Sequence, residues 1–401
     1  METPELCGTD PTDAYLRHSN SRIVSARPFS RAPYKSCTQI RFLVRMPRPV
    51  PQWKLSSPRT LPFASNAMIR LICLTLLTVA FLTALTARGG ENVLLLPDAK
   101  DAANPPKLIL HGGGKITDDV FEKFIELAGG KNARIVFVPN AGYRQVEFDS
   151  EEEFLETLHE RFNAWPHLES SGQIESFRFL YTDEPDDADE EDFIRPLQEA
   201  TGVWFSGGAQ GRLNYRYVGE FPARTKFQFA LSELLERGGV VGGTSAGMAA
   251  LPEIMTLWQE DHEDGSPASA VAVHGLGLMR GAIVEQHFDT VGGRLERFTG
   301  LLRDAARLNR LSGRPNAGQT MVGLAVEEST ALIVEGNVLT TLGIGNSHIF
   351  LREPTLRALE WYELPSGESA QLERSPNQGT ALMRLELPKE TRNPNPLDDG
   401  R

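Results

Sequence analysis

Residues 240–251 read VVGGTSAGMAAL, and this stretch decides the fold prediction. Two valines begin a short apolar strand, and the small residues after Ser245 begin a helix. A Gly-x-Ser-x-Gly sequence between a strand and a helix is typical of a nucleophile elbow, a tight turn that lifts one hydroxyl out of the sheet. Glycines are favoured on both sides because the backbone is strained there and neighbouring elements pack closely. We therefore predict that Ser245 is a nucleophile, and that the helix amino terminus beside it favours an oxyanion.

The segments on both sides of this stretch alternate between strand and helix. Lys107 begins a short apolar run that ends in three glycines, and 133–142 is a longer, continuous apolar run. Continuous apolar strands are typical of a sheet covered on both faces. Residues 117–130 have the amphipathic pattern and acidic first turn of a helix. We predict a doubly wound α/β fold with its ligand site at the carboxyl ends of the strands, and a β-hairpin over 331–343 at the sheet edge.

Charge divides the chain into two parts. The 401 residues contain 41 Lys+Arg and 53 Asp+Glu, for a net charge of −12. Residues 1–67 have a net charge of +6 and hold 9 of the 26 prolines, whereas 68–401 have a net charge of −18. Because nucleic acids and anionic membranes attract basic surfaces, the acidic part argues against both partners.

The amino-terminal segments resemble processing signals rather than a folded domain. Residues 1–67 form a basic, proline-rich extension that we expect to be poorly ordered and to lie upstream of the true start, Met68. The apolar run 71–87 then has the layout of a signal peptide within 68–87, with cleavage near Ala87. An uncleaved membrane anchor is the alternative. Either way we expect export to the periplasm or the cell exterior.

Cysteine chemistry is confined to this amino-terminal part. The three cysteines are Cys7, Cys37 and Cys73, so no disulfide or thiolate nucleophile is available after residue 73. The acidic body must therefore be held by packing and polar contacts alone.

A serine nucleophile needs a base, and the base needs an orienting acid. His287 follows the apolar run 281–284, which predicts a strand with the histidine at its carboxyl end. His111 precedes a glycine-rich turn and could line the same crevice, although a hydrogen bond to a backbone carbonyl is the simpler expectation. The sequence identifies no partner for His274 or His348. No H-x-x-x-H or H-E-x-x-H pair is present, which argues against a zinc site.

Four stretches, in order, resemble the cyanophycinase and dipeptidase E group of serine peptidases. They are FSGGAQ (205–210), GTSAG (243–247), EQHF (285–288) and GLAVEESTA (323–331). The second and third are specific only in combination, and the resemblance extends over about 107–350. It implies a flavodoxin-like fold, also called class I glutamine amidotransferase-like, with a mostly parallel sheet and helices on both faces. The peptidase domain would span 105–352, followed by a β-rich extension and tail over 353–401.

The resemblance also implies the roles of individual residues. Ser245 would be the nucleophile and His287 the general base. The acid would be Glu328, with Glu327 beside it, if the cyanophycinase pattern holds. In the dipeptidase E pattern the acid follows the serine more closely, at Glu260 or Asp261. The remaining family positions would bind the oxyanion or the substrate; they are Gly208 and Ala246 through their backbone N–H groups, and Gln210, Glu285, Gln286, Arg294 and Arg297.

Two departures from the family pattern concern the substrate more than the reaction. Ala209 stands where cyanophycinases usually have Asp, and Glu285 stands where they have Asp. Arg294 and Arg297 are shifted by a residue relative to the family arginines. The implied reaction is acyl transfer through an acyl-enzyme, without metal or cofactor.

The expected partner is a peptide or a cyanophycin-like polymer, and a homodimer is one option that the resemblance implies. The acidic run Asp183–Asp192 is expected to be a solvated loop or helix entry, or a guide for an Arg-rich polymer. A small-peptide Asp-X dipeptidase and a non-catalytic peptide-binding homologue are the alternatives. The membrane is a partner only if 71–87 stays uncleaved.

Overall fold

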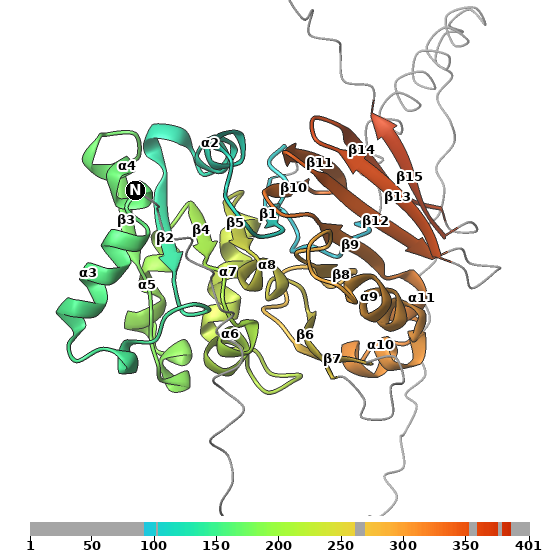
Figure 1. Cartoon of the computed structure of the whole chain (residues 1–401), viewed down its shortest axis with the longest axis horizontal. Coiled ribbons are helices and arrows are strands. Elements are labelled where there is room, and N and C mark those ends of the chain that lie inside the picture. Colours follow the sequence, from blue (N-terminus) through green and yellow to red (C-terminus); the bar gives the residue numbers. More distant parts are fainter. Residues whose placement is uncertain (1–91, 102, 261–268, 353–358, 376–378, 386–401) are drawn as a thin grey trace, which may run out of the picture. The chain divides into compact units, whose positions relative to one another are not determined.

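The computed structural model describes residues 92–385, except 102, 261–268, 353–358 and 376–378 (Figure 1). The described residues belong to one compact unit, Leu76–Arg401. The predicted extension 1–67 and signal segment 68–87 lie outside the described residues. Within the described part, no helix is both long enough and apolar enough to cross a bilayer.

Five parallel strands form one side of the larger sheet, in the order β1-β5-β4-β2-β3, with β3 at the edge. They are β1 (Lys107–His111), β2 (Arg134–Val138), β3 (Ser176–Phe179), β4 (Gly202–Phe205) and β5 (Val240–Thr244). If β2, β3, β4 and β5 are numbered 1 to 4, the segment β3-β2-β4-β5 has the order 2-1-3-4, which matches the start of the flavodoxin-like strand order 2-1-3-4-5. The predicted α/β fold with a mostly parallel sheet is confirmed.

Alternate residues of these strands enter two separate cores, as a sheet covered on both faces requires. In β4, Val203 and Phe205 join one core and Trp204 the other. One face is covered by α2 (Asp118–Leu127) and α4 (Ala164–Ser170), and the opposite face by α5, α6, α7 and α8 (Figure 1). These are α5 (Glu191–Glu199), α6 (Gln210–Tyr217), α7 (Lys226–Glu236) and α8 (Ala246–Ala249). The remaining helical segments before β3 are α3 (Glu151–Arg161), η2 (Gly130–Asn132) and η3 (Gln145–Glu147).

The predicted hairpin over 331–343 is confirmed but is not the edge of the sheet. Its strands are β10 (Thr330–Glu335), which pairs antiparallel with β1, and β11 (Val338–Gly343). β14 (Ser369–Ser375) and β15 (Gly379–Leu385) then continue the sheet to nine strands. Strands from the predicted 353–401 extension are therefore part of the sheet.

A second, four-stranded sheet was not predicted. Its order is β13-β12-β9-β8, with β8 and β9 parallel. The strands are β8 (Ala282–Glu285), β9 (Val322–Val326), β12 (Asn346–Arg352) and β13 (Leu359–Pro365). The helix α9 (Arg294–Arg303) packs Phe298 and Leu302 against it, and α10 (Ala305–Ser312) and α11 (Ala317–Thr320) follow. A two-stranded ribbon, β6 (Ile254–Glu260) with β7 (Ser269–His274), completes the described strands.

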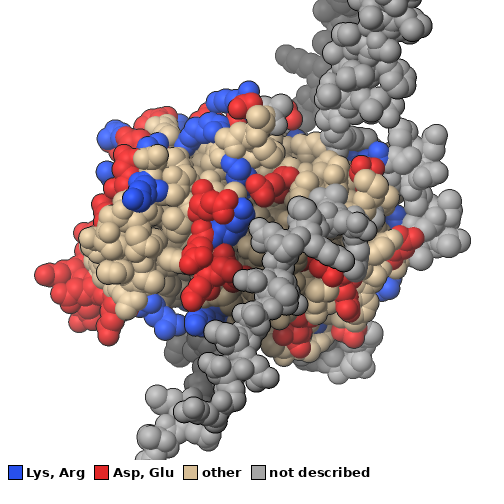
Figure 2. All heavy atoms as spheres, turned by 90° about the horizontal axis from the view of Figure 1, so that it is seen from above, with Lys and Arg blue, Asp and Glu red and all other residues tan. Residues whose placement is uncertain are grey.

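The acidic run Asp183–Asp192 forms the short helix η4 (Pro185–Asp189) and the start of α5, mostly exposed. This confirms the predicted helix entry. Asp183 is the exception, because it pairs with Arg216 at 2.6 Å. Arg216 is 4% exposed, so this ion pair is buried. In Figure 2 acidic side chains gather in several groups, with lysines and arginines between them.

Candidate active site

Ser245 lies in the tight turn between β5 and α8, as predicted. Its backbone has φ 52° and ψ −114°, which an L-residue seldom adopts. A Cβ on Gly243 would lie 2.5 Å from the Gly247 carbonyl carbon, and one on Gly247 would lie 2.5 Å from the Phe205 oxygen. Both glycines are therefore required for the turn to pack against β4. The Ser245 hydroxyl does not cap α8, which leaves it available to His287.

His287 and Glu328 follow the carboxyl ends of β8 and β9 in the second sheet. The Ser245 Oγ lies 2.6 Å from His287 Nε2, and His287 Nδ1 lies 2.6 Å from Glu328 Oε1. A carboxylate can only accept, so Nδ1 carries the proton and Nε2 is free to accept from the serine. The three side chains thus have the order and tautomer of a nucleophile, base and orienting acid.

The electrostatics of Glu328 favour its charged form. The hydrogen bond from His287 is the largest cause that lowers the pKa of Glu328, and a 3.0 Å hydrogen bond from Thr290 and the charge of Arg294 act in the same direction. The Asp289 side chain accepts from the Glu328 N–H at 2.9 Å, which fixes the backbone. The Glu328 carboxylate is therefore charged, and hydrogen bonds from His287 and Thr290 hold it in place.

The end of β1 joins the two sheets through three consecutive carbonyls, a feature that sequence reasoning missed. The oxygens of His111, Gly112 and Gly113 accept from the N–H groups of Ser245, His287 and Ser329 at 2.9, 2.8 and 2.7 Å. Ser329 directly follows Glu328. Gly113 also leaves room for the base, since a Cβ there would lie 2.2 Å from the His287 ring. The His-Gly-Gly-Gly sequence at 111–114 is the signal from which this feature could have been predicted.

The predicted oxyanion donors lie beside the serine turn. The N–H groups of Gly208 and Ala246 make no hydrogen bond within the described part of the chain. Gly207 approaches so closely that its Cβ would lie 3.5 Å from that of Ser245. Because α8 has only four residues, we attribute any oxyanion stabilisation to these individual N–H groups rather than to a helix dipole.

Gln210 is placed differently from the pocket-lining role that the resemblance implies. Its Nε2 donates to the carbonyls of Thr256 and Leu257 at 2.9 Å, so its amide nitrogen fastens β6. Gln286 is 3% exposed, and its Oε1 has no hydrogen-bond partner among the described residues. The Gln286 side chain is therefore a buried amide with an acceptor that the described residues leave unused, directly before His287.

Glu285, Arg294 and Arg297 form one buried ionic group. Arg297 donates to both oxygens of Glu285, through Nε at 2.9 Å and through Nη2, and Arg294 Nη1 donates at 2.8 Å. Glu285 is fully buried. Both arginines are thus bound to an internal carboxylate, although the Arg294 Nε has no partner in the described residues. Their contact with Glu285 fixes α9 on β8, directly beside His287.

His111 lies under the site and is fully buried. Its Nδ1 is 2.7 Å from the Thr244 hydroxyl, and the backbone of Lys115 also interacts with the ring. Burial lowers the pKa of His111 to about 4, so the ring is neutral at pH 7. The other expected lone histidines also have partners, because His274 contacts the Leu311 carbonyl at 2.7 Å and His348 contacts Glu327 at 2.9 Å.

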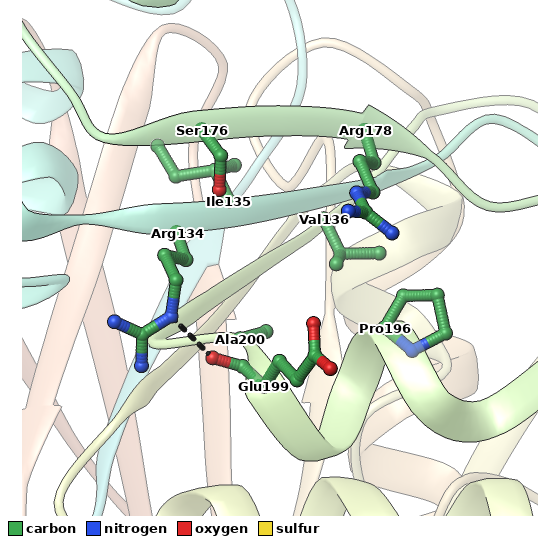
Figure 3. Close-up of a pocket in the computed structure, with 8 residues that line it drawn as sticks. All are labelled: Arg134, Ile135, Val136, Ser176, Arg178, Pro196, Glu199 and Ala200. Atoms are coloured by element: carbon green, nitrogen blue, oxygen red, sulfur yellow. Dashed lines mark hydrogen bonds between the residues drawn. The ribbon is translucent and has the colours of Figure 1, made fainter.

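The side chains of the alternative acids, Glu260 and Asp261, lie outside the described part of the chain. Only the backbone of Glu260, at the end of β6, is described. No group of three or more metal-ligating side chains is found in the described part of the chain. A small pocket between β2, β3 and α5, lined by Arg134, Arg178 and Glu199 among others, contains none of the three site residues (Figure 3).

The sequence model of peptidase family S51 matches residues 108–342, which include Ser245, His287 and Glu328. The chain belongs to this family. Cyanophycinases of Synechococcus elongatus and Thermosynechococcus vestitus are each 29% identical to it over 161 residues, 40% of this chain and 44% of theirs. The chain therefore matches less than half the length of these curated relatives. The cyanophycinase of Geminocystis herdmanii is 23% identical over 246 residues, 61% of this chain and 74% of its own.

Two solved structures are similar to this S51 chain at low identity. A peptidase from an acI-B1 actinobacterium is 19% identical with a TM-score of 0.44, covering 67% of this chain and 97% of its own. A putative peptidase E protein from Listeria monocytogenes EGD-e is 15% identical with a TM-score of 0.34, covering 60% and 99%. The family assignment depends on the sequence match and not on these two structures.

Proposed function

We propose that this S51 family member is a serine peptidase in which Ser245, His287 and Glu328 act as nucleophile, general base and orienting acid. The observation that carries the proposal is the continuous pair of 2.6 Å contacts from the Ser245 hydroxyl through the imidazole to the carboxylate. The family match, which includes all three residues, supports it further.

In the proposed reaction the Ser245 Oγ attacks the carbonyl carbon of a peptide or isopeptide bond while its proton passes to His287 Nε2. The Gly208 and Ala246 N–H groups stabilise the oxyanion that forms. The C–N bond then breaks as His287 returns the proton to the leaving amine, which gives an acyl-enzyme. Water then attacks the acyl carbon in place of the serine hydroxyl, with His287 again taking up and returning the proton. The carboxylic acid product leaves and the Ser245 hydroxyl is regenerated. Glu328 stabilises the imidazolium in both steps.

For the substrate we propose a peptide or β-aspartyl isopeptide bond, as in a cyanophycin-like polymer. The names of the relatives support this choice, and so does the acidic body, which would attract cationic side groups. We further propose that the protein is exported, because residues 68–87 have the layout of a signal peptide.

Labelling with a fluorophosphonate probe tests the chemistry without knowledge of the substrate. The purified chain should be labelled, and Ser245→Ala, whose melting temperature should be unchanged, should not. Equal labelling of both would refute the nucleophile assignment. No labelling of the native chain would favour a peptide-binding homologue.

A panel of β-Asp-Arg, α-Asp-X and β-Asp-X dipeptides then separates the substrates. Hydrolysis of β-Asp-Arg above the others would support the cyanophycinase type. Preference for α-Asp-X peptides would point instead to the dipeptidase E type.

A further inference from the structure

Behind Glu328 lies a second carboxylate–histidine contact, formed by Glu327 and His348. The His348 Nε2 is 2.9 Å from Glu327 Oε1, and the Trp361 indole nitrogen is 3.1 Å from His348 Nδ1. An indole N–H can only donate, so Nδ1 must accept and Nε2 must carry the proton that it donates to Glu327. Trp361 therefore holds His348 in one neutral tautomer.

Glu327 is also fixed by the start of β12. The Asn346 N–H donates to its Oε2 at 2.7 Å, and the side chain is 18% exposed. Glu327 and Glu328 are adjacent in the three-residue corner between β9 and β10. Any movement of Glu327 in so short a corner would therefore move the acid that orients His287.

His348 also contacts the chain next to the base. Its ring lies 4.9 Å from that of Phe288, the residue after His287, and Phe288 lies edge-on to Trp361 at 6.4 Å. His348 thus touches the neighbours of two site residues, Glu327 beside Glu328 and Phe288 beside His287. Both His348 and Trp361 lie beyond residues 108–342, which the family model matches.

We propose that His348 and Trp361 are positioning residues for the His287–Glu328 pair, acting through Glu327 and Phe288. The indole N–H fixes the orientation of the His348 ring, so that its Nε2 stays directed at Glu327 beside Glu328. This inference rests on the proposed serine peptidase function.

The test is the rate of fluorophosphonate labelling between pH 5 and 9. In Trp361→Phe the ring stacked on Phe350 is kept and only the N–H donor is lost. We expect labelling to slow by roughly three- to tenfold, the rate equivalent of one hydrogen bond. The loss should be present across this pH range, because the indole donor that orients the His348 ring is missing at every pH.

A double variant, Trp361→Phe with His348→Gln, separates positioning from general destabilisation. Glutamine has no ring tautomer to be fixed and can still donate to Glu327, so the double variant should regain most of the native labelling rate. The control is Tyr362→Phe, which removes a hydroxyl bonded to Glu360 from the same strand and should leave labelling unchanged.

Two results would overturn the inference. One is native labelling by Trp361→Phe at every pH, and the other is a loss that is not altered by His348→Gln. Failure of the unmodified chain to label would instead refute the proposed function itself.

Discussion

The two sheets hold their parts of the site by different means. In the nine-stranded sheet, Ser245 is fixed by backbone atoms in close contact, around Gly243 and Gly247, without any charge. In the four-stranded sheet, His287 lies beside the buried Glu285–Arg297 ion pair and Glu328 lies beside the Glu327–His348 contact. The Ser245 half of the site depends on glycines, which have no side chain. The His287–Glu328 half depends on contacts between charged or polar side chains.

This difference predicts different responses to substitution. A change at the serine turn should act through steric fit, whereas a change beside the base should act through unpaired charge. The expected effects below run from the largest to the smallest.

Ser245→Ala removes the hydroxyl that acts as the nucleophile in the proposed mechanism. We expect a loss of at least about 10³-fold in kcat/KM, by analogy with other serine triads, with no loss of fold. Steady-state hydrolysis of the best dipeptide in the panel measures it. Retained turnover would mean that the chemistry lies elsewhere in the molecule.

Glu285→Gln tests the charged half. It would leave two buried guanidinium groups without their carboxylate, which costs about 3–5 kcal/mol of unfolding free energy. Urea unfolding gives the value. The matched control is Glu191→Gln, which breaks the exposed pair with Lys226 and should change the unfolding free energy far less. Similar costs for both variants would contradict the role given to the buried group.

Two glycine substitutions compare the halves directly. In Gly247→Ala the new Cβ meets the Phe205 backbone oxygen, which cannot rotate away, so we expect a stability loss of about 3 kcal/mol. In Gly113→Ala the Cβ meets the His287 ring, which can rotate, but the φ of +125° at this position strains any L-residue. That variant should also lose stability, and for a given stability loss it should lose more labelling than Gly247→Ala, by about tenfold or more. Thermal melting combined with labelling distinguishes them, and the reverse pattern would disprove the comparison.

The smallest effect concerns pH and the neutral His111. Its pKa is about 4 in the folded chain and 6.5 as a free group, so the unfolded state binds more protons between these values. Stability is therefore complete above pH 6.5 and falls as the pH drops toward 4. The loss between pH 7 and pH 5 should be about 2 kcal/mol. In His111→Gln this part of the pH dependence should disappear, as urea unfolding at both pH values would reveal.

The sequence predicted the half of the site that depends on glycine. G-T-S-A-G marks the turn at Ser245 because strain and close packing permit few other residues there. The His287 and Glu328 positions followed from family resemblance, with Glu260 and Asp261 left open, and the contact geometry brings Glu328 to the base.

The second sheet and its charges could not be predicted in this way. Continuous apolar strands look alike in either sheet, so nothing in the sequence assigned β8 and β9 to a separate one. Arg297 lies twelve residues after Glu285, and Trp361 thirteen after His348, which no short-range periodicity connects. The arginines were therefore assigned to the substrate, although their described contacts are with Glu285.

The three carbonyls at the end of β1 accept hydrogen bonds from residues that are synthesised much later than β1 itself. Synthesis delivers His111, Gly112 and Gly113 first, while their partners at 245, 287 and 329 arrive much later. Domains fold largely as units once their sequence is available, and contacts between distant residues form slowly. A ribosome-bound or truncated chain that ends before residue 287 would thus carry a serine with neither base nor acid. Under the proposed function, the chain would therefore lack peptidase activity until synthesis had passed Glu328.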